Sequence, residues 1–379
     1  MVILPHVKRA VPMLALLLLA GLTGCSRTER PIYIGVAGAL SDPIGEPMRR
    51  AAQLAIGEIN ARGGVRGRPL ELIERDDFAN PDSAVRVAEE LYSSDAVAVV
   101  GHLFSGTTLA AAPIYNGGSR PLVAITPSSS APEVSDAGPY IFRMCPSDLA
   151  HGAALARWVT DRLQLKQGGV FYLDDDYGRG IRQSFAANLM DRGGKLVGME
   201  PYLGTTPEVA PQLERLAKLQ RPQFLFVAGN RPDAESILRG ARALNLQVPM
   251  LGGDGLEGIA EAGPVAEGTY VSAAYHPSLN TPANRKFVAA YAAKYPAAPV
   301  PNQPAAATYD AVNLLARAIE EGGPSRESVR RALDRVGHAT AAFEGATGKI
   351  AFDSLGDVPD KQVYITVVRN GAVLLAGGL

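Results

Sequence analysis

Short apolar runs alternate with helix-forming segments through most of the chain, and this alternation restricts the folds that it can adopt. The run at residues 97–100 is apolar on both faces and only a few residues long, which is typical of a strand buried in a parallel sheet. In segments such as 47–60, apolar residues recur at helical spacing. Strands and helices in this order predict an α/β fold with parallel sheets wound by helices on both faces.

The same two patterns predict the individual elements. Expected strands cover residues 32–40, 70–75, 97–100, 121–125, 140–143, 169–173, 195–202, 223–228, 248–251, 271–274, 363–369 and 372–376. Expected helices cover residues 47–60, 81–92, 105–115, 146–163, 178–191, 208–219, 232–244, 282–295, 305–321 and 327–336. Asn370-Gly371 joins the last two strands, and Asn-Gly between apolar runs is the strongest short signal for a β-hairpin.

Length and charge restrict the domain count and the class of partner. The chain has 379 residues, which is too many for one ordinary core and suits two domains. Arg-Gly-Gly follows an expected helix at both 62–64 and 192–194, within the same order of elements, which indicates two lobes of similar topology. The formal net charge is −1 and no basic stripe is present, so nucleic acid is not expected as a partner.

Residues 1–25 have the pattern of a targeting segment. Lys8 and Arg9 precede an apolar run at 10–21 that is too short for an ordinary membrane-spanning helix. The run ends in Leu22-Thr23-Gly24-Cys25, which resembles a bacterial lipobox, so Cys25 is expected to be lipidated and to become the first mature residue. A plain secretory signal or a buried apolar helix is the alternative. An Asp directly after the lipidated Cys would favour retention in the inner membrane. Ser26 stands there instead, which points to the outer membrane, with the inner membrane as the alternative.

The stretch 97–132 contains the first candidate binding residues. Ser105 stands where a helix is expected to begin, and Ser is a preferred N-cap beside the unpaired N–H groups of a helix start. The loop at 126–132 has four hydroxyls at the carboxyl end of an expected strand. Ligands bind at that edge of open α/β sheets, and helix starts bind anions. An ordinary cap and an ordinary loop are the alternative.

Beyond the leader, the chain resembles the type I periplasmic binding proteins of the leucine/isoleucine/valine-binding family, which feed ABC transporters. The matching stretches are residues 57–67, Asp76-Asp77 with Pro81, 100–105, 126–133, Phe142-Arg143 with Pro146-Ser147-Asp148, 177–180, 252–255, 266–268, 309–311 and 348–353. Each is weak alone, and together in this order they make the resemblance specific.

The resemblance implies two Rossmann-like, doubly wound lobes joined by three hinge strands, with the ligand trapped between them. The crossings are expected near Pro146, Ala274 and Phe352. Lobe one would then comprise residues 30–145 plus 275–351, and lobe two residues 146–274 plus 352–379.

The family's lobe-one ligand residues fall on three serines of this chain. By this resemblance, the Ser105 hydroxyl holds the ligand carboxylate. Ser128 and Ser130 hold carboxylate and ammonium through backbone groups and through the Ser130 hydroxyl.

In lobe two, the resemblance implies that Tyr177 reaches toward the ligand and that Asp254 pairs with its ammonium. Asn230 replaces an aromatic residue of the family site, and the loop between Ser41 and Met48 is shorter than the family's. These departures weaken the expectation of a leucine-like ligand. The family's lobe-one disulfide is also absent, because its two positions fall on Ala79 and Phe104.

The expected function is therefore a solute-binding lipoprotein of the periplasm. It would act as a monomer without cofactor or metal, and would deliver a small amino acid or related carboxylate to ABC permease and ATPase subunits. An anchored sensor of the same fold is the alternative. An enzyme is not expected, because the sequence has no Gly-x-Ser-x-Gly elbow, no Walker A motif and no nucleophile with its base.

Three other features are interpreted as structural or surface groups and not as parts of a site. Asp174-Asp175-Asp176 lacks the spacing of a calcium loop and is expected to be a solvated turn. His102, His151 and His276 lack metal-ligand spacing and are expected to be structural or surface residues. Cys145 has no partner in the chain if Cys25 is lipidated, and is expected to be buried.

Overall fold

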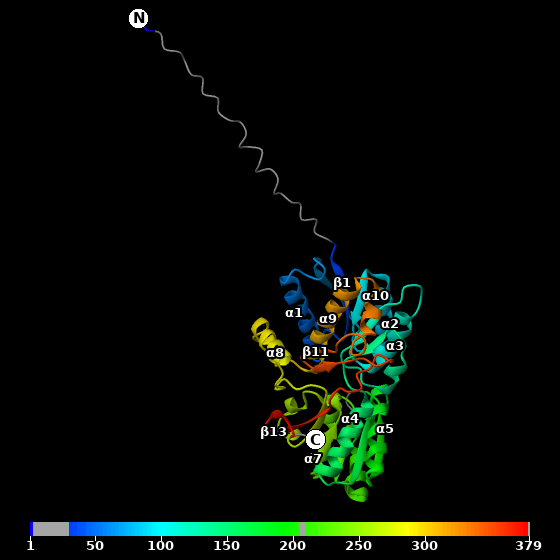
Figure 1. Cartoon of the computed structure of the whole chain (residues 1–379). Helices are drawn as coiled ribbons and strands as arrows, with labels where there is room; N and C mark the ends of the chain where they lie inside the picture. Colours follow the sequence, from blue (N-terminus) through cyan, green and yellow to red (C-terminus); the bar gives the residue numbers. More distant parts are fainter. Residues whose placement is uncertain (3–29, 205–208, 378–379) are drawn as a thin grey trace.

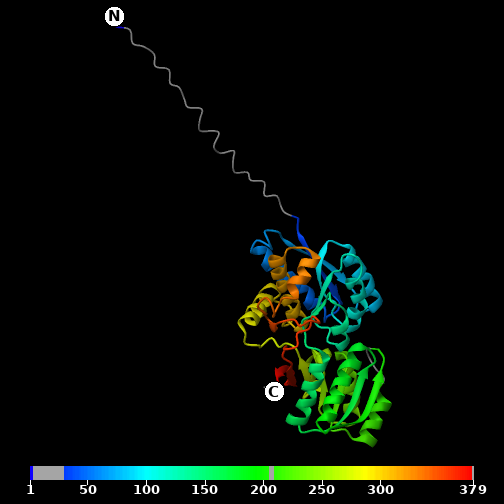
Figure 2. The same cartoon turned by 45° about the vertical axis from the view of Figure 1, so that its right-hand side comes forward.

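The computed structural model describes residues 1–2, 30–204 and 209–377. The predictions on the leader, including those for Cys25 and Ser26, fall on residues 3–29 and lie outside this part. Two sheets form two lobes, one above the other in Figure 1. Figure 2 shows that segments distant in sequence, coloured blue to cyan and orange, share the upper lobe, whereas the green segment and the red C-terminal end belong to the lower one.

Lobe one is built around a five-stranded sheet of order β2-β1-β3-β4-β5. Its elements are β1 (Ile32–Gly38), α1 (Glu46–Ala61), β2 (Leu70–Asp76), α2 (Pro81–Ser93), β3 (Ala96–Val100), α3 (Ser105–Asn116), β4 (Val123–Thr126), η1 (Pro132–Asp136), β5 (Ile141–Arg143), α8 (Pro282–Lys294), α9 (Gln303–Gly322), α10 (Arg326–Leu333), β11 (Phe343–Gly345) and β12 (Gly348–Ile350).

Lobe two is built around a seven-stranded sheet of order β14-β13-β10-β9-β8-β6-β7. Its elements are α4 (Asp148–Arg157), η2 (Trp158–Arg162), β6 (Gln167–Leu173), α5 (Asp176–Asp191), β7 (Lys195–Tyr202), α6 (Ala210–Arg215), η3 (Leu216–Gln220), β8 (Phe224–Ala228), α7 (Arg231–Ala243), β9 (Met250–Gly252), η4 (Asp254–Leu256), η5 (Ile259–Ala266), β10 (Tyr270–Ala273), β13 (Tyr364–Arg369) and β14 (Ala372–Leu375).

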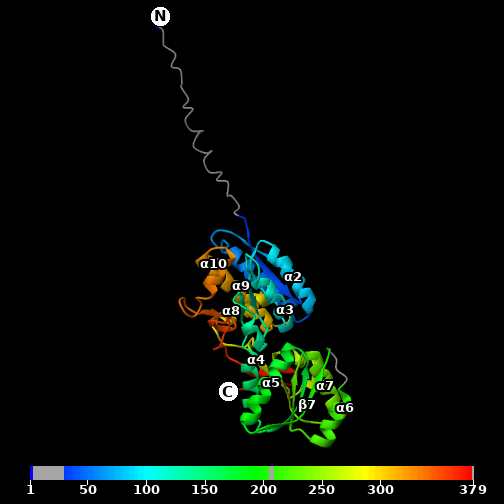
Figure 3. The ribbon, with the colours of Figure 1, turned by 90° about the vertical axis from the view of Figure 1, so that its right-hand side faces the viewer.

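Both sheets are covered on both faces, as the alternation predicts. In lobe one, α1, α9 and α10 pack one core around residues such as Met48, and α2 and α3 pack another around Tyr115. In lobe two, α4 and α5 enclose Phe185, and α6 and α7 enclose Ile237 on the other face. Figure 3 shows these helix pairs on opposite sides of each lobe. The predicted α/β class with two doubly wound lobes is confirmed.

Strand pairing follows the expected pattern. All pairs in the lobe-one sheet are parallel, and β6 to β10 pair in parallel in lobe two. The predicted terminal hairpin is confirmed, since β13 and β14 are antiparallel with Arg369 opposite Ala372. Parallel strands place all their carboxyl ends at one edge, so the loops after them are grouped there.

Three segments connect the lobes: one between β5 and α4, one between β10 and α8, and one between β12 and β13. In the last, Phe352 and Val358 pack in the lobe-one core, and Val363 packs in the lobe-two core. In this segment, the chain therefore passes from lobe one to lobe two between residues 358 and 363.

The structure departs from the predicted elements at several places, including the unpredicted 3-10 helices η1, η4 and η5. The helix expected at 146–163 starts at Asp148 and continues as the π-helix η2, and the helix expected at 208–219 runs as α6 and η3. The short hairpin β11–β12 was not predicted, because its three-residue strands are too short to show a period. Within the described ranges, no helix is both long and apolar enough to cross a membrane.

Candidate functional site

Carboxyl-terminal strand ends of the two lobes meet in one contact region, which we call the junction. The Asp148 N–H donates to the Ser130 carbonyl oxygen at 2.7 Å, and the Gln303 N–H donates to Glu257 Oε1 at 2.9 Å. Both hydrogen bonds join lobe one to lobe two, whose α4 and α5 lie directly below lobe one in Figure 1. The junction comprises Ser105, the loop 127–131 and Gln303 from lobe one, and Asp148, His151, Tyr177, Asp254 and Glu257 from lobe two.

Ser105 is the first residue of α3, and Phe104 occupies the N-cap position without a side-chain cap. The expectation that Ser105 caps this helix is therefore wrong. Its hydroxyl oxygen instead accepts a hydrogen bond from the Ala131 N–H at 3.2 Å, which ties the helix start to the following loop. Ser105 is 4% exposed, and within the described ranges no acceptor takes its hydroxyl hydrogen, which can therefore donate to an anion at the helix start.

The loop 127–131 presents its serines to different partners. The Ser128 hydroxyl donates to Gln303 Oε1 at 3.0 Å, and Gln303 Nε2 donates back to the Pro127 carbonyl oxygen. Ser129 lies inside lobe one, where its hydroxyl shares hydrogen bonds with Thr108 and Thr126. These contacts hold the loop in a defined shape, with Ser128 and Ser130 at the junction.

Tyr177 and Asp254 are brought together on the lobe-two side. The Tyr177 hydroxyl donates to Asp254 Oδ1 at 3.1 Å and accepts from the Gly255 N–H at 2.9 Å. Burial raises the pKa of Tyr177 well above its ordinary value, so the phenol stays a neutral donor. A Cβ at position 255 would lie 2.6 Å from the Gly229 carbonyl oxygen, so a glycine is needed for η4 to approach the end of β8 this closely.

Asn230 follows β8 and is the N-cap of α7. Its backbone N–H donates to Asp233 Oδ2 at 3.0 Å, and the Tyr202 hydroxyl donates to the same oxygen. In the described part of the chain, no hydrogen bond links Asn230 to Tyr177 or Asp254. The structure therefore places this predicted site residue at the correct sheet edge but does not join it to the other two.

Sequence reasoning missed the role of two buried groups on α4, Asp148 and His151. Asp148 is fully buried, and among the described residues neither carboxylate oxygen has a hydrogen-bond partner of good geometry. Burial raises its pKa well above the ordinary value and the charge of Asp254 adds to this, while the nearby Ser130 hydroxyl opposes it. An unpaired buried carboxylate is costly, so a partner is expected from outside the chain.

His151 lies one helical turn beyond Asp148, on the same face of α4. Its Nδ1 is 2.9 Å from the Ser272 hydroxyl, and its Nε2 is 3.8 Å from Asp254 Oδ2. The Nε2 atom is buried and has no hydrogen-bond partner in the described ranges. Burial lowers the pKa of His151, which favours the neutral ring. The spacing of Asp148 and His151 was the signal in the sequence, although only the fold shows what they face.

Glu257 and Gln303 form a second contact that sequence reasoning missed. Glu257 follows η4, and its Oε1 accepts from the backbone N–H at the first residue of α9. Burial raises the pKa of Glu257 to about 7, and the charge of Asp254 adds to the effect. The junction therefore has N–H and hydroxyl donors on the lobe-one side and three carboxylates on the other. This arrangement suits a molecule with an anionic and a cationic end.

The remaining candidates have structural roles. His102 is buried between Asp77 and the Tyr115 hydroxyl, at 2.6 Å and 3.0 Å. Cys145 is also buried, and burial raises the pKa of its thiol, which disfavours the reactive thiolate. Among the described residues, no group of three or more His, Cys, Asp or Glu side chains is arranged to hold a metal ion.

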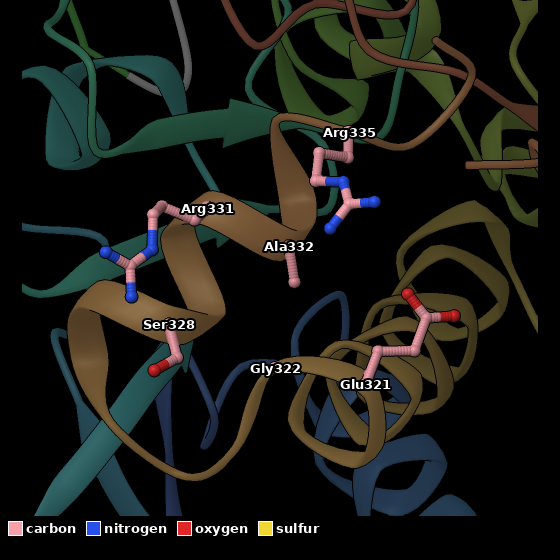
Figure 4. Close-up of a pocket in the computed structure, with 6 residues that line it drawn as sticks. All are labelled: Glu321, Gly322, Ser328, Arg331, Ala332 and Arg335. Carbon is pink, nitrogen blue, oxygen red and sulfur yellow. The ribbon is translucent and has the colours of Figure 1, made fainter. Parts of the chain in front are cut away.

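A small cavity of about 200 Å³ lies between the end of α9 and α10 (Figure 4). The side chains of Arg331 and Arg335 border it, together with Glu321. None of the predicted site residues lines it, and it belongs to lobe one alone.

Comparison with known proteins gives a consistent result over the whole chain. A family model described as "Periplasmic binding protein" matches residues 31–372. The leucine-, isoleucine-, valine-, threonine-, and alanine-binding protein of Pseudomonas aeruginosa is 29% identical over 364 residues, which cover 93% of each chain.

Solved structures agree with the sequence matches. A leucine binding protein, LivK, from Thermotoga maritima superposes with a TM-score of 0.82 at 28% identity, covering 91% of this chain and 98% of that one. An ABC transporter substrate-binding protein from Desulfitobacterium hafniense, in complex with Leu, gives a TM-score of 0.79 at 28% identity and covers 92% of this chain and all of its own.

Proposed function

The chain belongs to the periplasmic binding protein family, and from this we propose that it captures a small amino acid or related carboxylate between its lobes for delivery to an ABC importer. The activity is reversible binding, with no covalent chemistry. The relatives named above bind leucine and similar amino acids, which supports an amino acid as the ligand class.

The observation that carries the proposal is the buried, unpartnered carboxylate of Asp148 beside Asp254. A carboxylate removed from water is stabilised when a cation lies beside it and donates hydrogen bonds to its oxygens. The ammonium group of an amino acid would supply both. On the lobe-one side, the start of α3 with the Ser105 hydroxyl and the loop bearing Ser128 and Ser130 would receive the ligand's carboxylate. Tyr177 positions Asp254 for the ammonium.

A thermal-shift screen of the mature chain tests this proposal. The twenty common amino acids are compared with acids that lack the amine and with amines that lack the acid. A ligand that binds only the folded state at 100 times its Kd stabilises it by about 2.7 kcal/mol. We expect amino acids to raise the melting temperature more than either truncated series. Equal shifts from the acids without an amine would show that the lobe-two carboxylates do not pair with an ammonium.

We also propose that Cys25 is diacylated and anchors the protein in the periplasm, because a lipobox-like Leu22-Thr23-Gly24-Cys25 follows an apolar run. Mass spectrometry of the mature protein should show Cys25 as the modified first residue. An unmodified Cys25 side chain in the wild-type mature protein contradicts this assignment.

A further inference from the structure

We propose that the ligand carries a second positive group, on its side chain, and that Glu257 receives it, so that the ligand class is amino acids with basic side chains. The inference rests on the proposed function, because it locates the side chain of a ligand whose two main groups are held as described above. It goes further by distinguishing basic from aliphatic amino acids.

The charges at the junction are the first argument. Asp148, Asp254 and Glu257 all belong to lobe two, and the charge of Asp254 raises the pKa of both of the others. In the described part of the protein, no lysine or arginine forms an ion pair with any of them. The raised pKa of Glu257 reflects burial without a compensating cation, so a second positive group on the ligand would favour the ionised form of Glu257.

Arg143, whose charge lowers the pKa of Asp148 and so partly opposes the effect of burial, is already engaged. Arg143 donates to both oxygens of Asp357, at 2.9 Å and 2.6 Å, and to the carbonyl oxygens of Ser130 and Ala131. All of its guanidinium nitrogens therefore have partners within the protein. Arg143 consequently fixes the loop 127–131 and is not available to neutralise Glu257.

Unpartnered buried atoms supply an independent argument that a ligand group belongs here. Among the described residues, both buried carboxylate oxygens of Asp148 lack a hydrogen-bond partner of good geometry, and the buried Nε2 atom of His151 has no partner. These atoms adjoin Asp254, which lies three residues before Glu257. Native structures leave few such atoms, and each calls for an explanation such as a missing ion or ligand.

The place of Glu257 separates it from the ammonium end. Asp148 adjoins Ser130 through its backbone, whereas Glu257 reaches the other end of the same loop through Gln303 and Ser128. A ligand spanning the loop would thus have its ammonium near Asp148 and Asp254 and its side chain near Glu257 and Gln303. An aliphatic side chain there would displace water from a carboxylate and an amide without replacing the hydrogen bonds. A side-chain ammonium or guanidinium would replace them and would also supply the charge.

The test compares ligands that differ only in the side-chain charge. Calorimetry on the full mature chain uses lysine against norleucine and arginine against citrulline. We expect each basic amino acid to bind at least about 30-fold more tightly than its neutral counterpart. This comparison uses only the wild-type protein, so it does not depend on a variant that folds.

Glu257→Gln keeps the shape and an acceptor for the Gln303 N–H but removes the charge. In this variant, lysine and norleucine should bind with nearly equal affinity, whereas the control Glu235→Gln, at a partly exposed position on α7, should keep the wild-type preference. If norleucine or leucine binds wild type as tightly as lysine, the inference is wrong while the proposed function stands. If no amino acid binds, both are wrong.

Discussion

The two sides of the junction differ in how completely their polar groups are paired. On the lobe-one side, the Ser129 hydroxyl bonds to the hydroxyls of Thr108 and Thr126, and His102 is held by Asp77 and Tyr115. On the lobe-two side, the two carboxylate oxygens of Asp148 and the Nε2 atom of His151 have no hydrogen-bond partner of good geometry within the described residues. A fully paired network fixes a shape, whereas unpaired buried groups require an external partner. The difference implies that lobe one is preformed for the ligand and that lobe two is completed by it.

The largest effect on affinity is expected for Asp254→Asn, which removes the charge partner of the ligand ammonium and preserves the side-chain shape. Breaking a buried charge pair typically costs about 3–5 kcal/mol, or roughly two to three decades of affinity. Calorimetry with the amino acid identified by the screen measures this loss. The exposed Asp191→Asn on the same lobe is the matched control and should bind as wild type does. Wild-type affinity in Asp254→Asn would mean that no ammonium lies beside this carboxylate.

Ser105→Ala tests the preformed side with a smaller expected loss. The change removes one hydroxyl donor to the ligand carboxylate, which is worth about 1.5–3 kcal/mol for a hydrogen bond to a charged group. The loop also loses the acceptor for the Ala131 N–H. Binding by the amine series that lacks a carboxylate should not change, and this serves as the internal control. An equal loss for those amines would show that the serine acts only by shaping the loop.

Ser129→Ala tests whether the paired network of lobe one supports stability and not ligand contact. The variant leaves Thr108 and Thr126 without the hydroxyl that they share, so we expect a loss of about 1–3 kcal/mol in the free energy of unfolding. Urea denaturation measures the loss. Ser94→Ala, a hydroxyl that bonds only to nearby backbone groups at the end of α2, is the comparison. A drop in affinity without a drop in stability would contradict the division between the two sides.

The sequence predicted the elements that depend on local patterns. The run at 97–100 marked β3 to within one residue, because a strand buried on both faces is apolar at every position. Asn370-Gly371 marked the last hairpin, because few other dipeptides suit that turn. The family resemblance implied that Tyr177 and Asp254 both belong to the lobe-two side of the site, and the structure joins them by a hydrogen bond that was not predicted.

Features that depend on tertiary contacts were not predictable. Ser105 matched the local rule for a helix cap, but the Ala131 N–H, 26 residues later, determines what its hydroxyl does. Glu257 and Gln303 are 46 residues apart and lie in different lobes, so no local pattern joins them. His151 was expected to be structural or at the surface, and its importance lies in the carboxylate that the fold brings beside it. The residues missed are therefore those at the meeting point of the lobes.

The smallest expected effect concerns stability without ligand. Because the pKa of Asp148 is raised in the folded protein, the folded state retains a proton that the unfolded state releases, and stability falls as pH rises above about 4. Glu257 acts in the same direction between its ordinary value of 4.5 and about 7. The negative charge of Asp254 raises the pKa of Glu257, and the charge of Glu257 in turn raises the pKa of Tyr275. The empty protein should therefore lose stability from about pH 4.5 to pH 7.

Asp148→Asn replaces the ionisable carboxyl with an amide, whose N–H groups can donate to the carboxylate of the neighbouring Asp254. We expect the empty variant to gain about 1 kcal/mol at pH 7, the typical net value of one hydrogen bond, and to show a weaker fall in stability with pH. Its affinity for the amino acid should decrease, so stability and binding move in opposite directions. Denaturation at pH 5 and pH 7, with and without ligand, measures both. A variant that is less stable at pH 7 and binds normally would show that Asp148 is paired inside the protein, and the contrast between the two sides of the junction would then fail.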